Sequence, residues 1–533
     1  MNKSHFLSWP KILIIVLFLA AMTDLTIMSQ VRSENTKSLP KESQSVQAEG
    51  RPFSITKHQI MIDGHQIPYT ATAGEMTILK SDEKPGASMF FVAYTRDDIK
   101  DKSARPIMFC FNGGPGSSTV WLHLGGLGPK RVAMGDEGHP LKTPAELVDS
   151  DCSLLDVSDL VFVDAVSTGY SRPLPGEKGS QFHGVGEDGQ AFAEFIRIYL
   201  TKFDRWSSPK FLLGESYGTT RAAVLSGILQ NQTYGIYLNG IILLSSVLDF
   251  STISFSPGNN LPYMIFLPHY TATAWYHKKL AAPEQNKPLT AVLEEARKFA
   301  VEEYLPALIK GNLLPAEQVE TVAKKMSELT GLSIAYLKNS NLRVRHDRFV
   351  KELLRDRRLT VGRLDSRFTG READAAGESY EYDPSSALIM GAFSAALNNY
   401  VGTVLNYKKE VPYAIYGNVY PWDFNFQPEE MGPPESSRST GRGFRQGTLY
   451  VAETLRRAMA ENAALKVFCC LGYYDGATPF LGTEYTFSQL MLDGSFKDRV
   501  RMGYYEAGHM MYIHKPSLKK LKSDLAAFIA WAT

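Results

Sequence analysis

Short apolar runs that are typical of buried strands alternate with amphipathic stretches over the first half of the chain. The runs predict strands at 53–79, where an antiparallel pair turns at Asp63-Gly64, and at 88–94, 106–111, 160–166, 210–213 and 238–245. The stretches 187–203 and 219–229 have the apolar spacing of helices. Alternation of strand and helix favours an α/β fold whose central sheet is mostly parallel and has helices on both faces.

The pattern changes after residue 250. Residues 282–329 are charged and helix-like, and the run RVRHDRFVKELLRDRR at 343–358 is typical of a solvated helix face. Strand character returns at 465–472 and 499–505, and a helix is predicted at 516–531. We therefore expect a core in two parts, 53–250 and 441–533, with residues 251–440 inserted between them as a largely helical cap.

The N-terminal residues differ from the rest of the chain. Lys3 and Lys11 precede the apolar run 12–22, which is the layout of a secretory signal peptide within residues 1–30. Residues 31–52 are polar and lack periodicity, as in a disordered tether. This predicts a secreted or periplasmic protein. A membrane-anchored protein with an uncleaved N-terminal segment is the alternative, since the apolar run is near the lower limit for spanning a bilayer.

Composition and net charge restrict the classes of molecule that the protein is expected to bind. The chain has 533 residues and a net charge of +1, so bulk charge does not favour nucleic acid. We expect no nucleic-acid partner and no stable membrane insertion after signal cleavage, and the oligomeric state is left open. Four cysteines are too few for a disulfide framework, and Cys110, Cys469 and Cys470 lie in apolar runs that predict burial. One disulfide among the four stays open.

The motif Gly214-Glu215-Ser216-Tyr217-Gly218 lies between a predicted strand and a predicted helix. G-x-S-x-G in this context is the pattern of a nucleophile elbow, a sharp turn that exposes the serine hydroxyl. A serine hydroxyl is a weak nucleophile unless a base lies beside it. Ser216 is therefore the predicted nucleophile, and a glycine-rich turn with a capping serine is the alternative.

An elbow serine needs an acid and a histidine later in the chain, at strand ends. Asp475 directly follows the predicted strand 465–472, and His509 follows the strand 499–505. Among the eleven histidines His514 is the nearest rival, and Asp249, at the end of another strand, is the rival acid. Asp249 has a second interpretation as a cap for the next segment.

The stretch Asn112-Gly113-Gly114-Pro115-Gly116-Ser117-Ser118 follows the strand 106–111. Two adjacent glycines at a strand end let the backbone approach a ligand closely, as an oxyanion hole requires. The alternative is a tight turn without a role in chemistry.

Together, N-G-G-P-G-S-S at 112–118, G-E-S-Y-G at 214–218, Tyr474-Asp475 and Gly508-His509-Met510 resemble the serine carboxypeptidase family, particularly its bacterial exported members. The resemblance covers about residues 85–250 and 445–520 and leaves the predicted cap unmatched. It implies an α/β-hydrolase fold. It also implies a serine-type carboxypeptidase that releases C-terminal residues from peptides through an acyl-enzyme on Ser216, with no metal and no cofactor.

The resemblance assigns further roles. The N–H groups of Gly114 and Tyr217 would hold the oxyanion, while Asn112, Gly113 and Glu215 would bind the C-terminal carboxylate of a peptide substrate. Where the family has a second Glu, which bonds the first, this chain has Gly126, and the family's loop cysteine is Ser117 here. The alternatives are an esterase or acyltransferase with the same triad, or a catalytically inactive binding protein.

Overall fold

The computed structural model describes residues 53–80, 82–426 and 448–533. The predicted signal peptide and tether, and residues 427–440 of the predicted cap, lie outside these ranges.

A mixed sheet forms the centre of the molecule. Within the described residues it has ten strands in the order β1-β2-β3-β7-β4-β9-β10-β13-β14, with β8 paired to β3. Strands β1 to β3 and β7 pair antiparallel, whereas all pairs from β7 to β14 are parallel. The strands are β1 Ser54–Ile62, β2 His65–Leu79, β3 Pro85–Arg96, β4 Ile107–Phe111, β7 Asp159–Val163, β8 Arg172–Pro173, β9 Lys210–Glu215, β10 Gly240–Leu244, β13 Lys466–Gly472 and β14 Val500–Tyr505.

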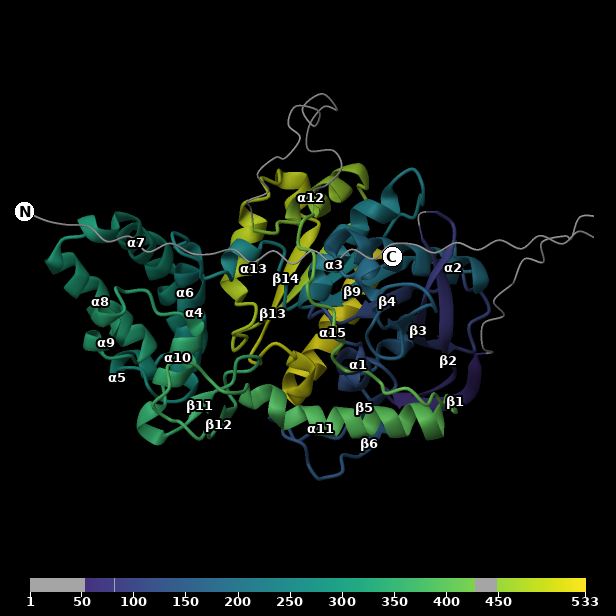
Figure 1. Ribbon diagram of the computed structural model, residues 1–533, viewed down its shortest axis with the longest axis horizontal. Coiled ribbons are helices and arrows are strands. Elements are labelled where there is room, and N and C mark those ends of the chain that lie inside the picture. The colour runs from purple at the N-terminus through teal and green to yellow at the C-terminus, as the bar shows by residue number, and fades with distance from the viewer. Residues whose placement is uncertain (1–52, 81, 427–447) are drawn as a thin grey trace, which may run out of the picture. The chain divides into compact units, whose positions relative to one another are not determined.

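Both faces of the sheet are covered by helices, because successive residues of each buried strand point to opposite faces. In β4, Ile107 and Phe109 belong to one apolar core, whereas Met108 and Cys110 belong to another. Helices of the first core are α2 Val185–Lys202, α3 Tyr217–Gln230 and α12 Ala452–Glu461, and those of the second are α1 Val120–Leu122, α11 Pro384–Asn399 and α15 Lys515–Ala532. The predicted mostly parallel sheet with helices on both faces is confirmed (Figure 1).

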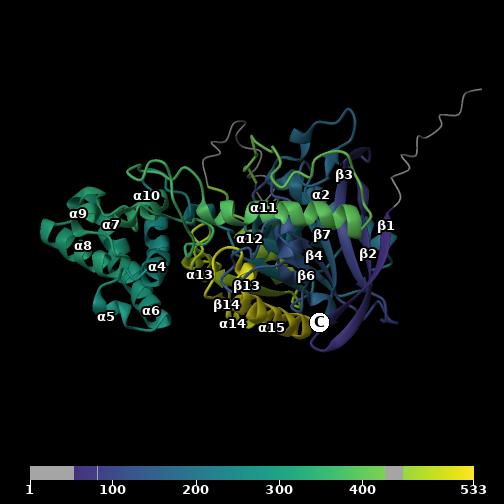
Figure 2. The ribbon, with the colours of Figure 1, turned by 90° about the horizontal axis from the view of Figure 1, so that it is seen from below.

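Between β10 and β13 the chain is largely helical, and helices α4 to α10 form a group beside the sheet in both views (Figures 1 and 2). Its elements are α4 Leu261–Tyr276, α5 Ala282–Gln285, α6 Leu289–Phe299, the π-turn Ala300–Tyr304, α7 Leu305–Lys310, the 3-10 turn Gly311–Leu313, α8 Ala316–Thr330, α9 Ile334–Asn339, α10 His346–Glu352, the 3-10 turn Arg355–Arg357, and strands β11 Thr360–Val361 and β12 Thr369–Gly370.

The charged run 343–358 differs from its prediction as a solvated helix face. Only seven of its residues, in α10, are α-helical, and Arg355–Arg357 form a separate 3-10 turn. Phe349 and Val350 are buried in the helical group, and Lys351 is buried in an ion pair with Glu372. Because the apolar residues of the run pack inside the helical group, one side of α10 is buried. The carboxylate of Glu372 compensates the charge of Lys351 on that side.

The last part of the insertion returns to the sheet domain. Helix α11 continues into the π-turn Tyr400–Val404, and together they are long and apolar enough to cross a membrane by length and composition alone. The following stretch bonds to the core: Ser118 N–H donates to Ile415 O (2.9 Å), and Val185 N–H donates to Asp423 O (3.0 Å). Residues 413–423 therefore lie against the loop that follows β4.

The remaining elements are short. They are the π-turn His123–Leu127, β5 Lys130–Val132, β6 Leu147–Asp149, the 3-10 turns Leu154–Asp156, Gly179–Phe182, Phe250–Thr252 and Met511–Ile513, α13 Phe480–Ser488 and α14 Gly494–Lys497. All four cysteines are buried free thiols, so no disulfide forms among these described residues.

Candidate active site

The motif around Ser216 forms a sharp turn between β9 and α3. Ser216 has φ 60° and ψ −128°, a left-handed conformation that a side chain rarely adopts, and its N–H donates to Leu244 O (3.0 Å) at the end of β10. A Cβ at Gly214 would lie 2.1 Å from the Gly218 carbonyl oxygen, so only glycine fits there. The turn leaves Ser216 partly exposed, with its hydroxyl at the N-terminus of α3.

Asp475 and His509 are joined directly. His509 Nδ1 lies 2.8 Å from Asp475 Oδ2, and both side chains are buried. Asp475 also accepts from the N–H groups of Ala477 (2.8 Å) and Thr478 (2.9 Å) and from Thr478 Oγ1 (2.7 Å). Burial alone would raise the pKa of Asp475, but His509 and these hydrogen bonds hold it below its usual value. The carboxyl is thus an anion fixed against the imidazole.

The pairing with Asp475 also changes the pKa of the His509 imidazole. Burial lowers the pKa of His509, but the Asp475 carboxylate outweighs burial and raises that pKa above its ordinary value. An imidazole held in this way is oriented at Nδ1 and keeps Nε2 for another partner.

The strand β10 links this pair to the elbow. Leu244 O, in the last residue of β10, accepts from Ser216 N–H, and Ser245 Oγ donates to His509 O (2.7 Å). Within the described residues Ser216 Oγ and His509 do not hydrogen-bond to each other. Catalytic hydrogen bonds are often long before substrate binds and shorten in the complex.

The two rival residues are occupied elsewhere. Asp249 accepts from Ser251 N–H (2.8 Å) and Ser251 Oγ (2.6 Å), which makes it the N-cap of a 3-10 turn. His514 Nδ1 lies 2.8 Å from Ser517 Oγ, at the start of α15. Asp249 thus caps a local turn, and the His514 side chain is bonded to a neighbouring serine side chain.

The loop after β4 packs directly against the elbow. A Cβ at Gly113 would lie 2.3 Å from Tyr217 N, so the absence of a side chain permits this approach. Gly114 has φ 107°, which favours glycine. Within the described residues the N–H groups of Gly113, Gly114 and Tyr217 donate to no acceptor. Unpaired donors beside a partly exposed serine are what an oxyanion hole requires.

Arg221 holds the loop in place. Its guanidinium donates to Asn112 O (2.7 Å) and pairs with Asp188 of α2, and both charged side chains are buried. The sequence reading did not single out Arg221, because an arginine in the second turn of a helix carries no local sign that it is buried.

Glu215 is buried beside the nucleophile, and its carboxyl has unusual proton chemistry. Tyr512 Oη donates to Glu215 Oε2 (2.8 Å). Burial raises the pKa of Glu215 to about 7, although the charge of His509 and hydrogen bonds from Tyr512 and Asn112 oppose the rise. Glu215 therefore exchanges a proton near neutral pH, whereas an exposed Glu is fully ionised there.

Residues 66–310 match the family model described as serine carboxypeptidase. The match covers the part of the chain from β2 to α7 and includes the elbow and the loop that follows β4. It supports a hydrolase of the serine carboxypeptidase type, and that family implies a peptide substrate. No curated protein matches the sequence.

Solved structures agree with the α/β-hydrolase fold. A prohormone-processing carboxypeptidase from Saccharomyces cerevisiae is similar over 86% of this chain and 91% of its own, with TM-score 0.50 and 14% identity. A proline iminopeptidase from Mycobacterium smegmatis (86% and 98% covered, TM-score 0.35, 14% identity) and a carboxyl esterase from Bacillus coagulans (86% and 98% covered, TM-score 0.33, 12% identity) are more distant. At these identities the likeness concerns the fold alone.

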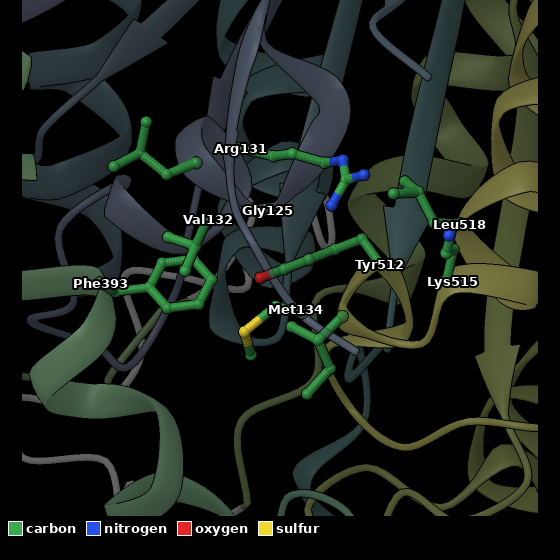
Figure 3. A pocket seen from close by; sticks show the side chains of 10 residues that line it. Gly125, Arg131, Val132, Met134, Phe393, Tyr512, Lys515 and Leu518 are labelled. Atoms are coloured by element: carbon green, nitrogen blue, oxygen red, sulfur yellow. The ribbon is translucent and has the colours of Figure 1, made fainter. Parts of the chain in front are cut away.

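Tyr512 lies beside Gly125, next to Gly126, the position at which this chain lacks the second carboxyl of the serine carboxypeptidase family. A Cβ at Gly125 would lie 2.2 Å from the Tyr512 ring, and one at Gly126 would lie 2.8 Å from Leu518. Figure 3 shows the Tyr512 side chain between Phe393 and Leu518, where it lines a cavity of only about 10 Å³ together with Gly125. The ring fills the space above the two glycines, and its hydroxyl becomes the partner of Glu215.

The insertion also contacts the candidate site. His509 N–H donates to Leu364 O (2.6 Å), Gly508 N–H donates to Asp365 Oδ2 (3.1 Å), and Ser366 N–H donates to Tyr474 O (3.0 Å). Residues 363–366 thus connect the Asp475 loop with the His509 loop. Sequence reasoning missed this segment, since it matched no motif and only the folded chain brings it to both loops.

Proposed function

We propose that the protein is a serine-type carboxypeptidase that releases C-terminal residues from peptides through an acyl-enzyme on Ser216. The observation that carries this proposal is the buried Glu215 next to the nucleophile, with a pKa raised to about 7. A protonated carboxyl can donate to a carboxylate, whereas an ionised one would repel it. The elbow of a plain esterase has no need of such a group.

In the proposed reaction Ser216 Oγ attacks the last peptide carbonyl while His509 Nε2 takes its proton. Asp475 stabilises the imidazolium through Nδ1, and the N–H groups of Gly114 and Tyr217 hold the oxyanion. His509 then donates the proton to the departing amine, the C–N bond breaks, and the acyl group stays on Ser216. A water molecule, deprotonated by His509, releases the shortened peptide.

The leaving group is an amino acid with a free carboxylate. We assign its recognition to the side chain of Asn112, the N–H of Gly113 and the protonated carboxyl of Glu215. All three adjoin the elbow, and burial makes each polar contact stronger than it would be in water.

The test compares N-blocked dipeptides that differ only at the C terminus, free acid against amide. We expect the free acid to have kcat/KM at least about 100-fold higher, because charge-assisted hydrogen bonds of about 1.5–3 kcal/mol are lost in the amide. Equal rates would contradict the exopeptidase assignment and favour an esterase or acyltransferase. Absence of Ser216 labelling by a fluorophosphonate in folded protein would favour an inactive binding protein.

A further inference from the structure

A cleft of about 410 Å³ opens beside the loop that carries Asp475. Gly476 and Ala477, which directly follow Asp475, form one wall, and the insertion contributes Arg345, His346 and Arg363 among others. No role in the proposed reaction uses this space. It is large enough for an amino-acid side chain and lies next to the reacting residues.

Arg363 is fixed between the two loops of the site by its backbone. Its carbonyl oxygen accepts from Gly476 N–H (3.0 Å), and the next residue, Leu364, accepts from His509 N–H. The positive charge of Arg363 is also felt by His509, where it adds to burial in lowering the imidazole pKa against the larger effect of Asp475. Arg363 therefore belongs to the surroundings of the reacting atoms.

Arg363 is also one of the residues that line the cleft. Within the described residues its guanidinium makes no ion pair or hydrogen bond, and the residue is only partly exposed. The nearby Asp383 uses its carboxylate on the N–H groups of Arg363, Leu364 and Ser385. A partly buried cation without a counterion is costly unless a ligand supplies the anion.

The other groups of the cleft add no net charge. Arg345 pairs with Asp347 (3.0 Å), which also lines the cleft. Burial lowers the pKa of His346 well below its ordinary value, so this histidine is neutral. Phe255 and Phe266 supply apolar wall. The cleft thus combines an apolar lining with one uncompensated positive charge.

We propose that this cleft binds an acidic side chain of the substrate, on a residue adjoining the scissile bond, through the guanidinium of Arg363. The proposal rests on the carboxypeptidase function proposed above and adds its substrate preference. Guanidinium matches a carboxylate with two parallel hydrogen bonds, and the phenyl rings would pack on the methylene groups of a glutamate. This carboxylate is a second one, apart from the C-terminal carboxylate assigned to Asn112 and Glu215.

The experiment measures the ratio of kcat/KM for Glu over Gln in N-blocked dipeptides, with the pair placed at the last or at the penultimate position. At pH 6.5 a Glu side chain is ionised and Gln has the same shape. The wild-type ratio should exceed about ten at one of the two positions, since a charge-assisted hydrogen bond contributes about 1.5–3 kcal/mol. Arg363→Gln should bring the ratio near one, and Arg363→Lys should keep part of it.

Arg345→Lys is the matched control, because it alters a second guanidinium of the same cleft but keeps the charge that Asp347 compensates. Its ratio should equal that of the wild type. A wild-type ratio near one at both positions would overturn the proposal. An equal loss on Glu and Gln peptides in Arg363→Gln would also overturn it, because it would indicate a structural role only.

Binding of the same peptides to Ser216→Ala, measured by calorimetry, separates this proposal from the proposed function. If peptides are not cleaved but the Glu peptide binds at least about tenfold more tightly than the Gln peptide, and Arg363→Gln removes the difference, the cleft is supported and the function fails. If Gln peptides are cleaved and no preference for Glu appears in rate or binding, the function stands and the cleft proposal fails.

Discussion

At the scale of single residues, the site depends on Asp475, whose carboxylate stays ionised although its side chain is fully buried. Four hydrogen bonds, including that of His509, satisfy its two oxygens. Asp475→Asn should keep the shape but hold the imidazole in the wrong tautomer, and kcat/KM should fall about 10⁴-fold on peptides and esters alike. Circular dichroism checks the fold. Asp249→Asn, which removes the charge of the rival acid but keeps an N-cap oxygen, is the control. A larger loss in Asp249→Asn would show that the acid is misassigned.

Glu215 predicts a specific pH dependence. Its proton is needed to bind the substrate carboxylate, so kcat/KM for free-acid peptides should fall as pH rises through about 7. His509 must be neutral to act as base, so the same rate should also fall at low pH, below the raised pKa of His509. For amidated peptides or esters only the low-pH fall should remain. Glu215→Gln should remove the fall in kcat/KM at high pH. A pH profile that still falls on both sides in this variant would contradict the role of Glu215.

The role of the Tyr512 hydroxyl can be tested through the same pH dependence of kcat/KM. Its hydrogen bond lowers the pKa of Glu215 against the effect of burial, so Tyr512→Phe should raise that pKa. The high-pH fall in kcat/KM for free-acid peptides should then move to higher pH, while the profile for esters stays in place. Phe keeps the ring that packs on Gly125. A lower rate at all pH values with an unchanged profile would indicate a packing role alone.

At the scale of elements, the segment 363–366 of the insertion joins the two loops of the site. Asp365 accepts from Gly508 N–H and pairs with Arg367, and both side chains are buried. Asp365→Asn should destabilise the protein by about 3 kcal/mol, because it removes the buried counterion of Arg367 and leaves only the exposed carboxylate of Glu137 (3.3 Å). Denaturant unfolding measures this difference.

Glu146→Gln is the control for that measurement, since the Lys142–Glu146 pair is exposed on both sides. Its effect should stay below about 1 kcal/mol. Similar small effects in both variants would show that the insertion does not support the site energetically.

At the scale of the whole molecule, two buried carboxyls should make stability depend on pH. Burial raises the pKa of Glu215 to about 7 and that of Asp164 to about 6. Because the folded pKa exceeds the unfolded one, the stability they contribute is present at low pH and is lost as pH rises from about 4 to about 7. The loss is on the order of 3 kcal/mol for each group.

The double variant Glu215→Gln and Asp164→Asn cannot titrate at these positions. Its free energy of unfolding relative to the wild type should therefore increase between pH 4 and pH 7.5, as measured by urea denaturation at both values. A difference that stays constant with pH would show that the two carboxyls are ionised in the folded protein.

Much of the core and of the candidate site could be predicted from the sequence, because the signals are local. Strand β9, the G-x-S-x-G motif and α3 are contiguous, and the buried strands β10 and β13 show as apolar runs. The positions of Asp475 and His509 directly after strands follow from the way parallel strands bring their carboxyl ends to one edge of the sheet. The prediction for the charged run at 343–358 was wrong, because its many charged residues obscure the apolar residues on one side of α10.

The sequence alone does not indicate which distant segments contact one another. It does determine the elbow motif, the order of Ser216, Asp475 and His509, and the absence of a carboxyl at Gly126. Only the tertiary structure decides that Tyr512 meets Glu215 across 297 positions, and that Arg363 is held between two loops from elsewhere in the chain. Such contacts carry no local pattern, because burial and hydrogen-bond partners depend on which segments the fold packs together.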